Sequence, residues 1–355
     1  MPNAKLAARR ALLLVVPFLT GVAVALTLFA CCCPARVGRD DGILRPEPAP
    51  PIGVAHFDVP RDAVPAKRTQ AEMHNVLFHV DRTIVLKIHS LRGEFHDKSE
   101  GQPLNFDDKK SFVVRIDQAR IGLSGRGLSD LMNHYVFAYE GAPLRDLSIR
   151  VHEGRLVQQG VMHKIIDIPF EMTADVSITD QGWMRIHPID IEICNLDGES
   201  LMKAFGMSLD EILKKLPEGV RVEKNDLLLE PLAILPPPAI VGRVVDVELH
   251  EDELLQVFDD GRSAPALSPP DPAEKNWMHF EEGTLRMGKL FMVRADMQVV
   301  DSDPRDPFDF FVDYYNSQLA AGFNRTQLDY GLKVFMRDFD DLGKPPQPGE
   351  RLASD

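Results

Sequence analysis

The clearest pattern in the chain is an alternation of apolar and polar residues over positions 169–180. Successive side chains of a strand point to opposite faces, so this pattern predicts a long strand with one apolar face. After the turn residues Asp180-Gln181-Gly182 the alternation resumes, breaks at Pro188, and predicts a second strand paired with the first. The predicted apolar face comprises Phe170, Met172, Ala174, Val176 and Ile178 on the first strand and Met184, Ile186, Ile189, Ile191 and Ile193 on the second.

Runs rich in Val, Ile and Leu predict further hairpins. Strands are expected at 76–96 and 112–123, at 144–151 and 156–166, and within 277–300, with turn or bulge signals at Glu282-Gly283 and Met287-Gly288. The three consecutive prolines before position 239 cannot lie in a central strand, so they predict a rigid connection to a strand at 239–249. A last strand is expected at 332–335.

Apolar residues at intervals of three and four predict amphipathic helices. The segment 128–139 has such a stripe, and 201–216 has another that restarts after Gly206 at the capping box Ser208-Leu209-Asp210-Glu211. A short helix is expected at 250–258, and the aromatic stretches 308–311 and 314–319 are expected to be helical. Antiparallel hairpins combined with single-stripe helices indicate the α+β class.

The N-terminus carries an uncharged run of 23 residues from Ala11 to Cys33, preceded by three basic residues. This length can cross a bilayer, and the preceding positive charges favour a cytoplasmic N-terminus with the rest of the chain on the far side. A cleaved signal peptide is the alternative. The sequence Leu28-Phe29-Ala30-Cys31 also resembles a bacterial lipobox, which would make Cys31 the lipidated residue, although Phe29 departs from the usual small or medium residue.

These features divide the chain into segments with different expected roles. Residues 34–68 and 260–275 are rich in proline and polar residues, without helical or strand periodicity. The expected organisation is a signal or transmembrane anchor at 1–33, a proline-rich stalk at 34–68, an α+β domain at 69–259, a linker at 260–275, a C-terminal β/α extension at 276–342 and a disordered tail at 343–355.

Composition narrows the class of partner. The formal net charge is −14, and it falls to −17 without the three basic residues before the apolar run, which argues against nucleic acid as a partner. Beyond the three cysteines that end this run, Cys194 is alone. The exported body therefore has no internal disulfide, and its stability has to come from an apolar core.

The sequence offers no convincing catalytic constellation. It contains no Gly-x-Ser-x-Gly, no His-Glu-x-x-His, no phosphate-binding glycine loop and no Cys-x-x-Cys, so no enzyme activity, cofactor or metal site is expected. The richest group of carboxylates can be interpreted as calcium ligands or, more simply, as turn and helix-capping aspartates. It comprises Asp296, Asp301, Asp303, Asp306 and Asp309.

One stretch resembles a known family. After the Asp180-Gln181-Gly182 strand pair and a helix come Gly219-Val220-Arg221-Val222, then 225–230 (Asn-Asp-Leu-Leu-Leu-Glu) and 237–242 (Pro-Pro-Ala-Ile-Val-Gly). This order resembles bacterial LmeA-like phospholipid-binding proteins, which are similar to the tubular lipid-binding (BPI-like) superfamily. Over residues 75–258 the resemblance implies a long, bent antiparallel sheet that wraps amphipathic helices and leaves an apolar space for acyl chains.

The leading hypothesis is a lipid-binding protein of the bacterial cell envelope, tethered to a membrane on its extracytoplasmic side, with a phospholipid or other acyl lipid as its partner. The first alternative is a non-enzymatic envelope scaffold or assembly factor in which the same faces form a packed core. The second alternative is a metal-dependent hydrolase that uses the carboxylates at 301–309. The expected lipid-lining residues are Leu131, Tyr135, Phe170, Met172, Val176, Ile178, Met184, Ile186, Leu213 and Leu216.

Overall fold

A computed structural model describes residues 68–99, 102–163, 167–193, 196–197, 216–250, 253–262, 267, 271–327 and 331–353. The predicted anchor, Cys31, the stalk up to residue 67, the predicted helix up to residue 215 with Leu213, and Cys194 lie outside these residues. Among the residues described, no helix is both long and apolar enough to cross a membrane.

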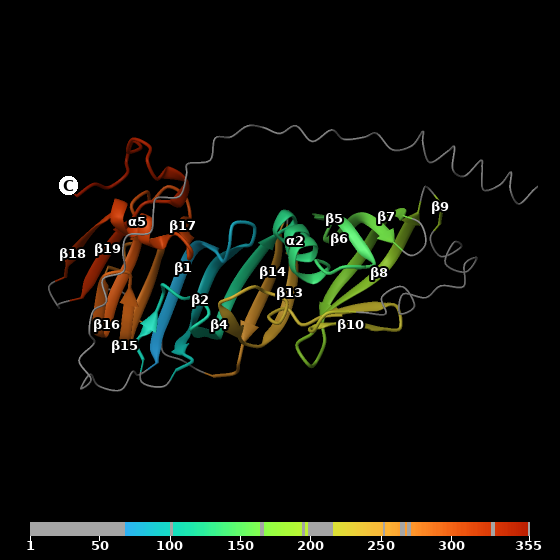
Figure 1. Ribbon diagram of the computed structural model, residues 1–355, viewed down its shortest axis with the longest axis horizontal. Helices are drawn as coiled ribbons and strands as arrows, with labels where there is room; N and C mark the ends of the chain where they lie inside the picture. Colours follow the sequence, from blue (N-terminus) through green and yellow to red (C-terminus); the bar gives the residue numbers. More distant parts are fainter. Residues whose placement is uncertain are drawn as a thin grey trace, which may run out of the picture. The chain divides into compact units, whose positions relative to one another are not determined.

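The described strands form two sheets, and the larger one has twelve strands (Figure 1). Its main path runs β13-β14-β4-β2-β1-β15-β16-β19-β18, and short strands pair at its sides. The long strands are β1 (Thr69–His79), β2 (Val85–Asp97), β4 (Phe112–Ser124), β13 (Val244–His250), β14 (Glu253–Asp259), β15 (Trp277–Met287) and β16 (Leu290–Asp301). The shorter strands are β3 (Leu104–Asn105), β12 (Ala239–Val241), β17 (Phe308–Phe311), β18 (Phe323–Thr326) and β19 (Leu332–Met336).

The hairpins predicted in this sheet are confirmed at β2–β4 and β15–β16, which pair antiparallel. The sheet is nevertheless mixed, because β16 with β19 and β1 with β17 pair parallel. Strands on both sides of the proline-rich stretch 260–275 share this sheet, since β1 pairs with β15. The residues that form its core therefore come from both ends of the described chain.

Two of the predicted strands are divided. The strand expected at 76–96 is interrupted where the Asp81 carboxylate accepts hydrogen bonds from the amides of Thr83 at 2.7 Å and Ile84 at 2.8 Å. Aspartate side chains that bind the backbone two or three residues ahead favour a turn, and this turn separates β1 from β2. The strand expected at 239–249 is likewise divided into β12, which pairs with β4, and β13, which pairs with β14.

The helix predicted at 250–258 is wrong, because residues 253–259 form β14 between β4 and β13. Leu254 and Leu255 are both buried, at 1% and 4% exposure, so the strand has apolar side chains on both faces. A strand buried on two sides has no period-two signal, which makes its short apolar run resemble a helix turn.

Only one of the two aromatic stretches is helical as predicted. Residues Tyr315–Ala321 form α5, which overlaps the second stretch and extends two residues beyond it. The first stretch is the strand β17, whose Phe308 and Phe310 are fully buried beside β1. Aromatic residues fit a buried strand as well as a helix, and pairing with β1 determines the outcome here.

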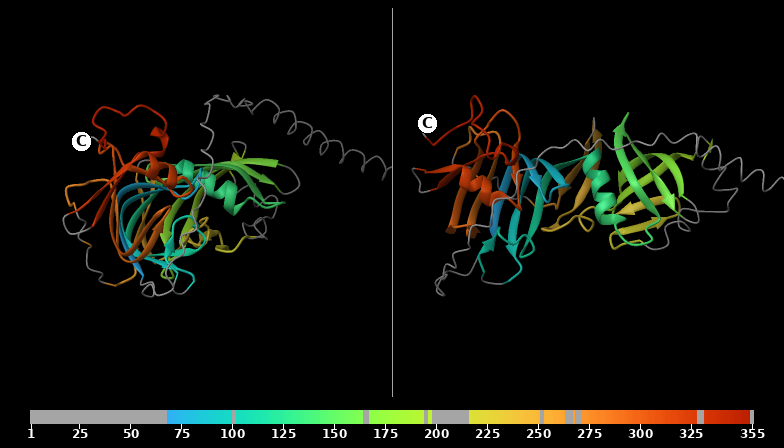
Figure 2. Two further views of the ribbon diagram at one scale, coloured as in Figure 1. Left: turned by 60° about the vertical axis from the view of Figure 1, so that its left-hand side comes forward. Right: turned by 45° about the horizontal axis from the view of Figure 1, so that its top comes forward.

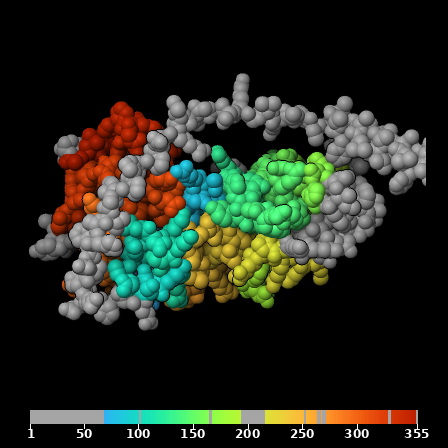
Figure 3. All heavy atoms as spheres, viewed as in Figure 1, coloured from blue at the N-terminus to red at the C-terminus, as the bar shows by residue number. Residues whose placement is uncertain are grey.

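The C-terminal residues described, up to 353, do not form the disordered tail predicted from residue 343. After the short helix η2 (Phe339–Asp341), the chain returns to the sheet, where the Arg351 amide donates to the Ser302 carbonyl at 2.8 Å. Glu350 is buried and pairs with Arg337. Figure 3 shows this red segment packed directly on its orange neighbours. Specific ion pairs order a segment that lacks any apolar periodicity.

The second sheet has seven strands, all paired antiparallel, in the order β10-β11-β8-β7-β6-β5, with β9 beside β8. It confirms the hairpins predicted around Glu153-Gly154 and Asp180-Gln181-Gly182. Its strands are β5 (Leu144–His152), β6 (Arg155–His163), β7 (Asp167–Ile178), β8 (Met184–Ile193), β9 (Leu196–Asp197), β10 (Val220–Glu223) and β11 (Asp226–Leu229).

The helix predicted at 128–139 is formed by α2 (Gly125–Leu131) and the π-helical segment η1 (Met132–Val136). It begins where the Ser124 side chain accepts from the Gly127 amide at 3.1 Å, an N-cap of the usual kind. The α2 helix packs beside β5 (Figure 2). Of the residues that the structure describes, 57% lie in strands and 9% in helices. This part of the chain is therefore rich in open sheets, and its helices are fewer than the predicted α+β class suggested.

Candidate functional site

The β7–β8 hairpin brings the two halves of the predicted apolar face together. Val176 lies opposite Ile186, and Ile178 lies opposite Met184. The polar side chains of the alternation point to the opposite face, where Asp175 and Ser177 are exposed. The sequence pattern therefore identified the inner face of this hairpin correctly, because one face of the antiparallel sheet is covered and the other meets solvent.

The predicted lining residues on this face differ in burial. Met172, Met184 and Ile186 are buried at 9%, 4% and 4% exposure, inside a cluster that also includes side chains of β5 and β11. Phe170, Val176, Ile178 and Leu216 are half-buried and pack against that cluster. The structure thus combines a filled centre with a margin of apolar side chains that keep part of their surface exposed.

Two of the predicted lining residues lie elsewhere. Leu131 is buried in the core of the larger sheet. Tyr135 is 39% exposed, and its hydroxyl donates to the Asp81 carboxylate in the β1–β2 turn. The π-helical hydrogen bond from the Phe137 amide to the Met132 carbonyl, 2.8 Å long, changes the helix period. Met132 and Val136 are therefore buried, while Tyr135 turns outward.

Ile189 also departs from the predicted face. It is 46% exposed, because the β7–β8 register shifts between Thr173, which pairs with Asp190, and Ala174, which pairs with Pro188. The extra residue in a β-bulge has no partner, and the side-chain alternation changes phase there. Ile191 and Ile193 return to the apolar cluster beyond the bulge.

The margin of this cluster extends onto β13 and β14, the two strands at one edge of the larger sheet. Leu254 of β14 is buried in it, and Val247 and Leu249 of β13 pack against it while half-buried. These residues were predicted as strand or helix positions without a functional role. Their apolar character was readable in the sequence, but their contact with the second sheet depends on tertiary structure.

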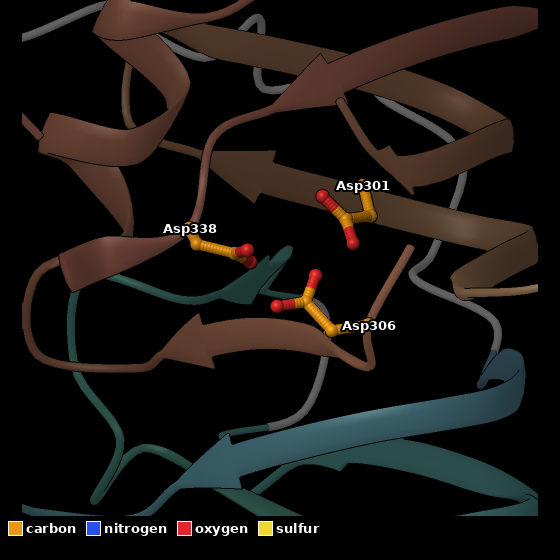
Figure 4. A group of neighbouring side chains, drawn as sticks. All are labelled: Asp301, Asp306 and Asp338. Atoms are coloured by element: carbon orange, nitrogen blue, oxygen red, sulfur yellow. The ribbon is translucent and has the colours of Figure 1, made fainter. Parts of the chain in front are cut away.

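A second constellation lies at the far end of the larger sheet. Asp301 ends β16, Asp306 precedes β17, and Asp338 follows β19. Their carboxylate oxygens lie within 4.8 Å of one another and point toward a common centre (Figure 4). Asp338 was missed by sequence reasoning because it is distant along the chain, yet β16 and β19 are parallel, so their carboxyl ends meet.

The other predicted carboxylates are paired elsewhere. Asp296 accepts from His279 at 3.0 Å, Asp303 pairs with Arg305, and Asp309 pairs with His79. In the part of the chain that the structure describes, the converging group therefore consists of three aspartates without a histidine. The metal-dependent hydrolase therefore stays a prediction, with Asp338 in place of Asp303 and Asp309 in the converging group.

Burial and mutual repulsion favour the neutral forms of these aspartates. Burial, with repulsion from Asp338, raises the pKa of Asp301 to about 9. Burial also raises the pKa of Asp338 to about 8, despite a hydrogen bond from the Asp309 amide to its carboxylate. At neutral pH these two groups therefore hold protons, and the cluster can share hydrogen bonds instead of carrying three charges.

No protein-family model matches the chain, and neither a curated protein nor a solved structure matches it. The resemblance to LmeA-like proteins therefore stays a prediction from the residues that carry it.

Proposed function

We propose that this chain is a lipid-binding protein of the bacterial cell envelope, tethered on the extracytoplasmic side of a membrane, that holds an acyl chain along the apolar margin of the β7–β8 face. The observation that carries this proposal is the row of half-buried apolar side chains at Phe170, Val176 and Ile178. Apolar side chains that keep exposed surface beside a packed cluster favour contact with an apolar ligand.

The lining set is smaller in this proposal than the sequence alone suggested. Met172, Met184 and Ile186 form the floor, because they are already buried by protein atoms. The ligand would contact the half-buried residues of β7, Leu216, and Val247 and Leu249 of β13. We propose as well that the sheet bends around its helices and that the N-terminal apolar run anchors the chain.

The energy of acyl burial is sufficient for such a role. Removing one methylene from water contributes about 0.8 kcal/mol, so ten methylenes contribute about 8 kcal/mol before the cost of immobilising the chain. That cost is of comparable size, about 4 kcal/mol or more. The expected affinity is therefore modest, which suits a protein that meets its ligand in an adjacent membrane.

A matched pair of variants tests this proposal on the full-length protein extracted in mild detergent. Val176→Glu places a charge on the apolar margin, whereas Ser177→Glu places the same charge on the opposite, exposed face. Native mass spectrometry should detect bound lipid in the wild type and in the Ser177 variant, and uptake of a fluorescent phospholipid should fall about tenfold in the Val176 variant. Thermal unfolding of both variants separates a lost site from a lost fold.

The envelope scaffold is the second candidate, and the burial of Met172, Met184 and Ile186 favours it. In that case the second cluster is only a core, and sheet edges would contact protein partners. Wild-type protein that carries no lipid and takes up no fluorescent phospholipid would exclude the lipid-binding proposal and leave the scaffold.

A further inference from the structure

A small charged hollow lies on the face of the larger sheet that is turned away from its core. Its volume is about 210 Å³. Ligand sites for drug-sized molecules begin at about 300 Å³, so this hollow suits a smaller group. Its walls are formed by Lys87 and His89 of β2, Arg120 of β4, His250 of β13, and Glu253 and Leu255 of β14.

The floor of the hollow is built from two special positions. Leu255 is buried at 4% exposure and supplies an apolar base. Gly122 lies beneath the Glu253 carboxyl group, and a Cβ atom at this glycine would come within 2.3 Å of it. The absence of a side chain at Gly122 therefore lets Glu253 reach across β4 to the basic residues of β2.

Glu253 in the wall of the hollow and Glu248, which pairs with two of its lining residues, are both engaged with bases. Glu253 contacts the Lys87 ammonium at 2.9 Å and His89 Nε2 at 2.6 Å, and these partners lower its pKa although burial opposes the change. Glu248 contacts His250 Nε2 and lies 3.5 Å from the Arg120 guanidinium. Lys87, Arg120 and His250 still expose about half of their side chains, at 44%, 47% and 59%.

The charge of this group depends on its histidines. With both histidines neutral, Lys87 and Arg120 balance Glu248 and Glu253. With both histidines protonated, the six groups carry two net positive charges. Asp246, two residues before Glu248 on β13, partly offsets them. Histidine is the side chain whose charge ordinarily changes between pH 5 and 8.

We propose that this hollow binds a small tetrahedral oxyanion of the phosphate class, and that binding is coupled to protonation of His89 and His250. The Arg120 guanidinium and the Lys87 ammonium supply fixed positive charge, and each imidazole adds a positive charge when it is protonated. The anion is either free in solution or the phosphate of a glycerol-phosphate headgroup. The proposal does not depend on acyl-chain binding at the β7–β8 face.

Isothermal titration of the full-length protein with inorganic sulfate tests this coupling, because sulfate keeps its charge between pH 5.5 and 7.5. We expect about tenfold tighter binding or more at pH 5.5 than at pH 7.5, because two added positive charges attract a dianion. The double variant His89→Gln/His250→Gln should lose this gain, while His152→Gln, an exposed histidine on β5, should keep it.

Two further measurements complete the test. Arg120→Gln should weaken sulfate binding at both pH values, since its charge does not titrate. Glycerol 3-phosphate that binds more tightly than sulfate would identify a headgroup as the source, and equal affinity would identify a free anion. Sulfate affinity that is the same at both pH values, or a pH gain that survives in the double histidine variant, would overturn the proposal.

Discussion

The aspartate cluster makes the stability of this protein unusually dependent on pH, and Asp338→Asn is the variant that exposes this dependence. The folded state holds protons on Asp301 and Asp338, whose pKa values are raised to about 9 and about 8. Free aspartate has a pKa of about 3.9, so the unfolded chain has lost both protons by pH 5. Their stabilising contribution is complete below the unfolded pKa and is lost as pH rises toward the folded pKa.

The size of the effect follows from proton counting. Each proton that the folded state holds and the unfolded state lacks makes the free energy of unfolding fall by about 1.4 kcal/mol per pH unit. Between pH 5 and 7 both groups contribute, so their combined slope is about −2.7 kcal/mol per pH unit. In Asp338→Asn the contribution of these two groups to the slope should be about half as large, because position 338 no longer carries a proton that the folded state holds and the unfolded state lacks. The asparagine oxygen can still accept from the Asp309 amide, which donates to Asp338 at 2.8 Å.

Urea unfolding of full-length protein in detergent at pH 5, 6 and 7 measures this slope directly. Asp340→Asn is the matched control, since Asp340 is an exposed neighbour on η2 and should leave the wild-type slope unchanged. Equal slopes in wild type and Asp338→Asn would show that the cluster does not hold the protons assigned to it.

Two other predictions concern stability, one through apolar packing and one through a buried ion pair. Ile186→Ala should destabilise the fold by about 2–5 kcal/mol, whereas Ile189→Ala at the bulge should change the unfolding free energy by less than about 0.5 kcal/mol, as urea midpoints will reveal. Similar losses at both positions would contradict the bulge. Glu350→Gln removes the negative charge that pairs with the Arg337 guanidinium, so about 3 kcal/mol should be lost and residues 343–353 should become sensitive to protease; continued resistance would argue that the ion pair does not fasten this segment.

Sequence reasoning succeeded where one face of a strand meets solvent. The alternation at 170–178 and the turn at Asp180-Gln181-Gly182 fixed a hairpin that the structure contains. It failed for β14 and β17, because strands buried on both faces have no alternation to read. Their identity depends on neighbours that are distant in sequence.

The candidate sites show the same limit. The face of the sheet predicted for Val176 and Ile178 was correct. No local signal marks the bulge at Ile189 or the π-helical hydrogen bond that turns Tyr135 outward. Asp338 joined the aspartate cluster only through the parallel pairing of β16 with β19. Such pairings are global properties of the fold, and they decided which charged residues meet.

The position of β1 in the larger sheet has a consequence for how the chain is made. This first strand pairs with β2 on one side and with β15 on the other, and Gln70 lies opposite Glu281. A chain that emerges from the ribosome in order must therefore hold one edge of β1 open while about two hundred further residues are added. Exposed strand edges in such intermediates favour aggregation, and the late closure of a long loop slows folding. Nascent chains truncated before β15 should consequently be the ones that depend most on chaperones.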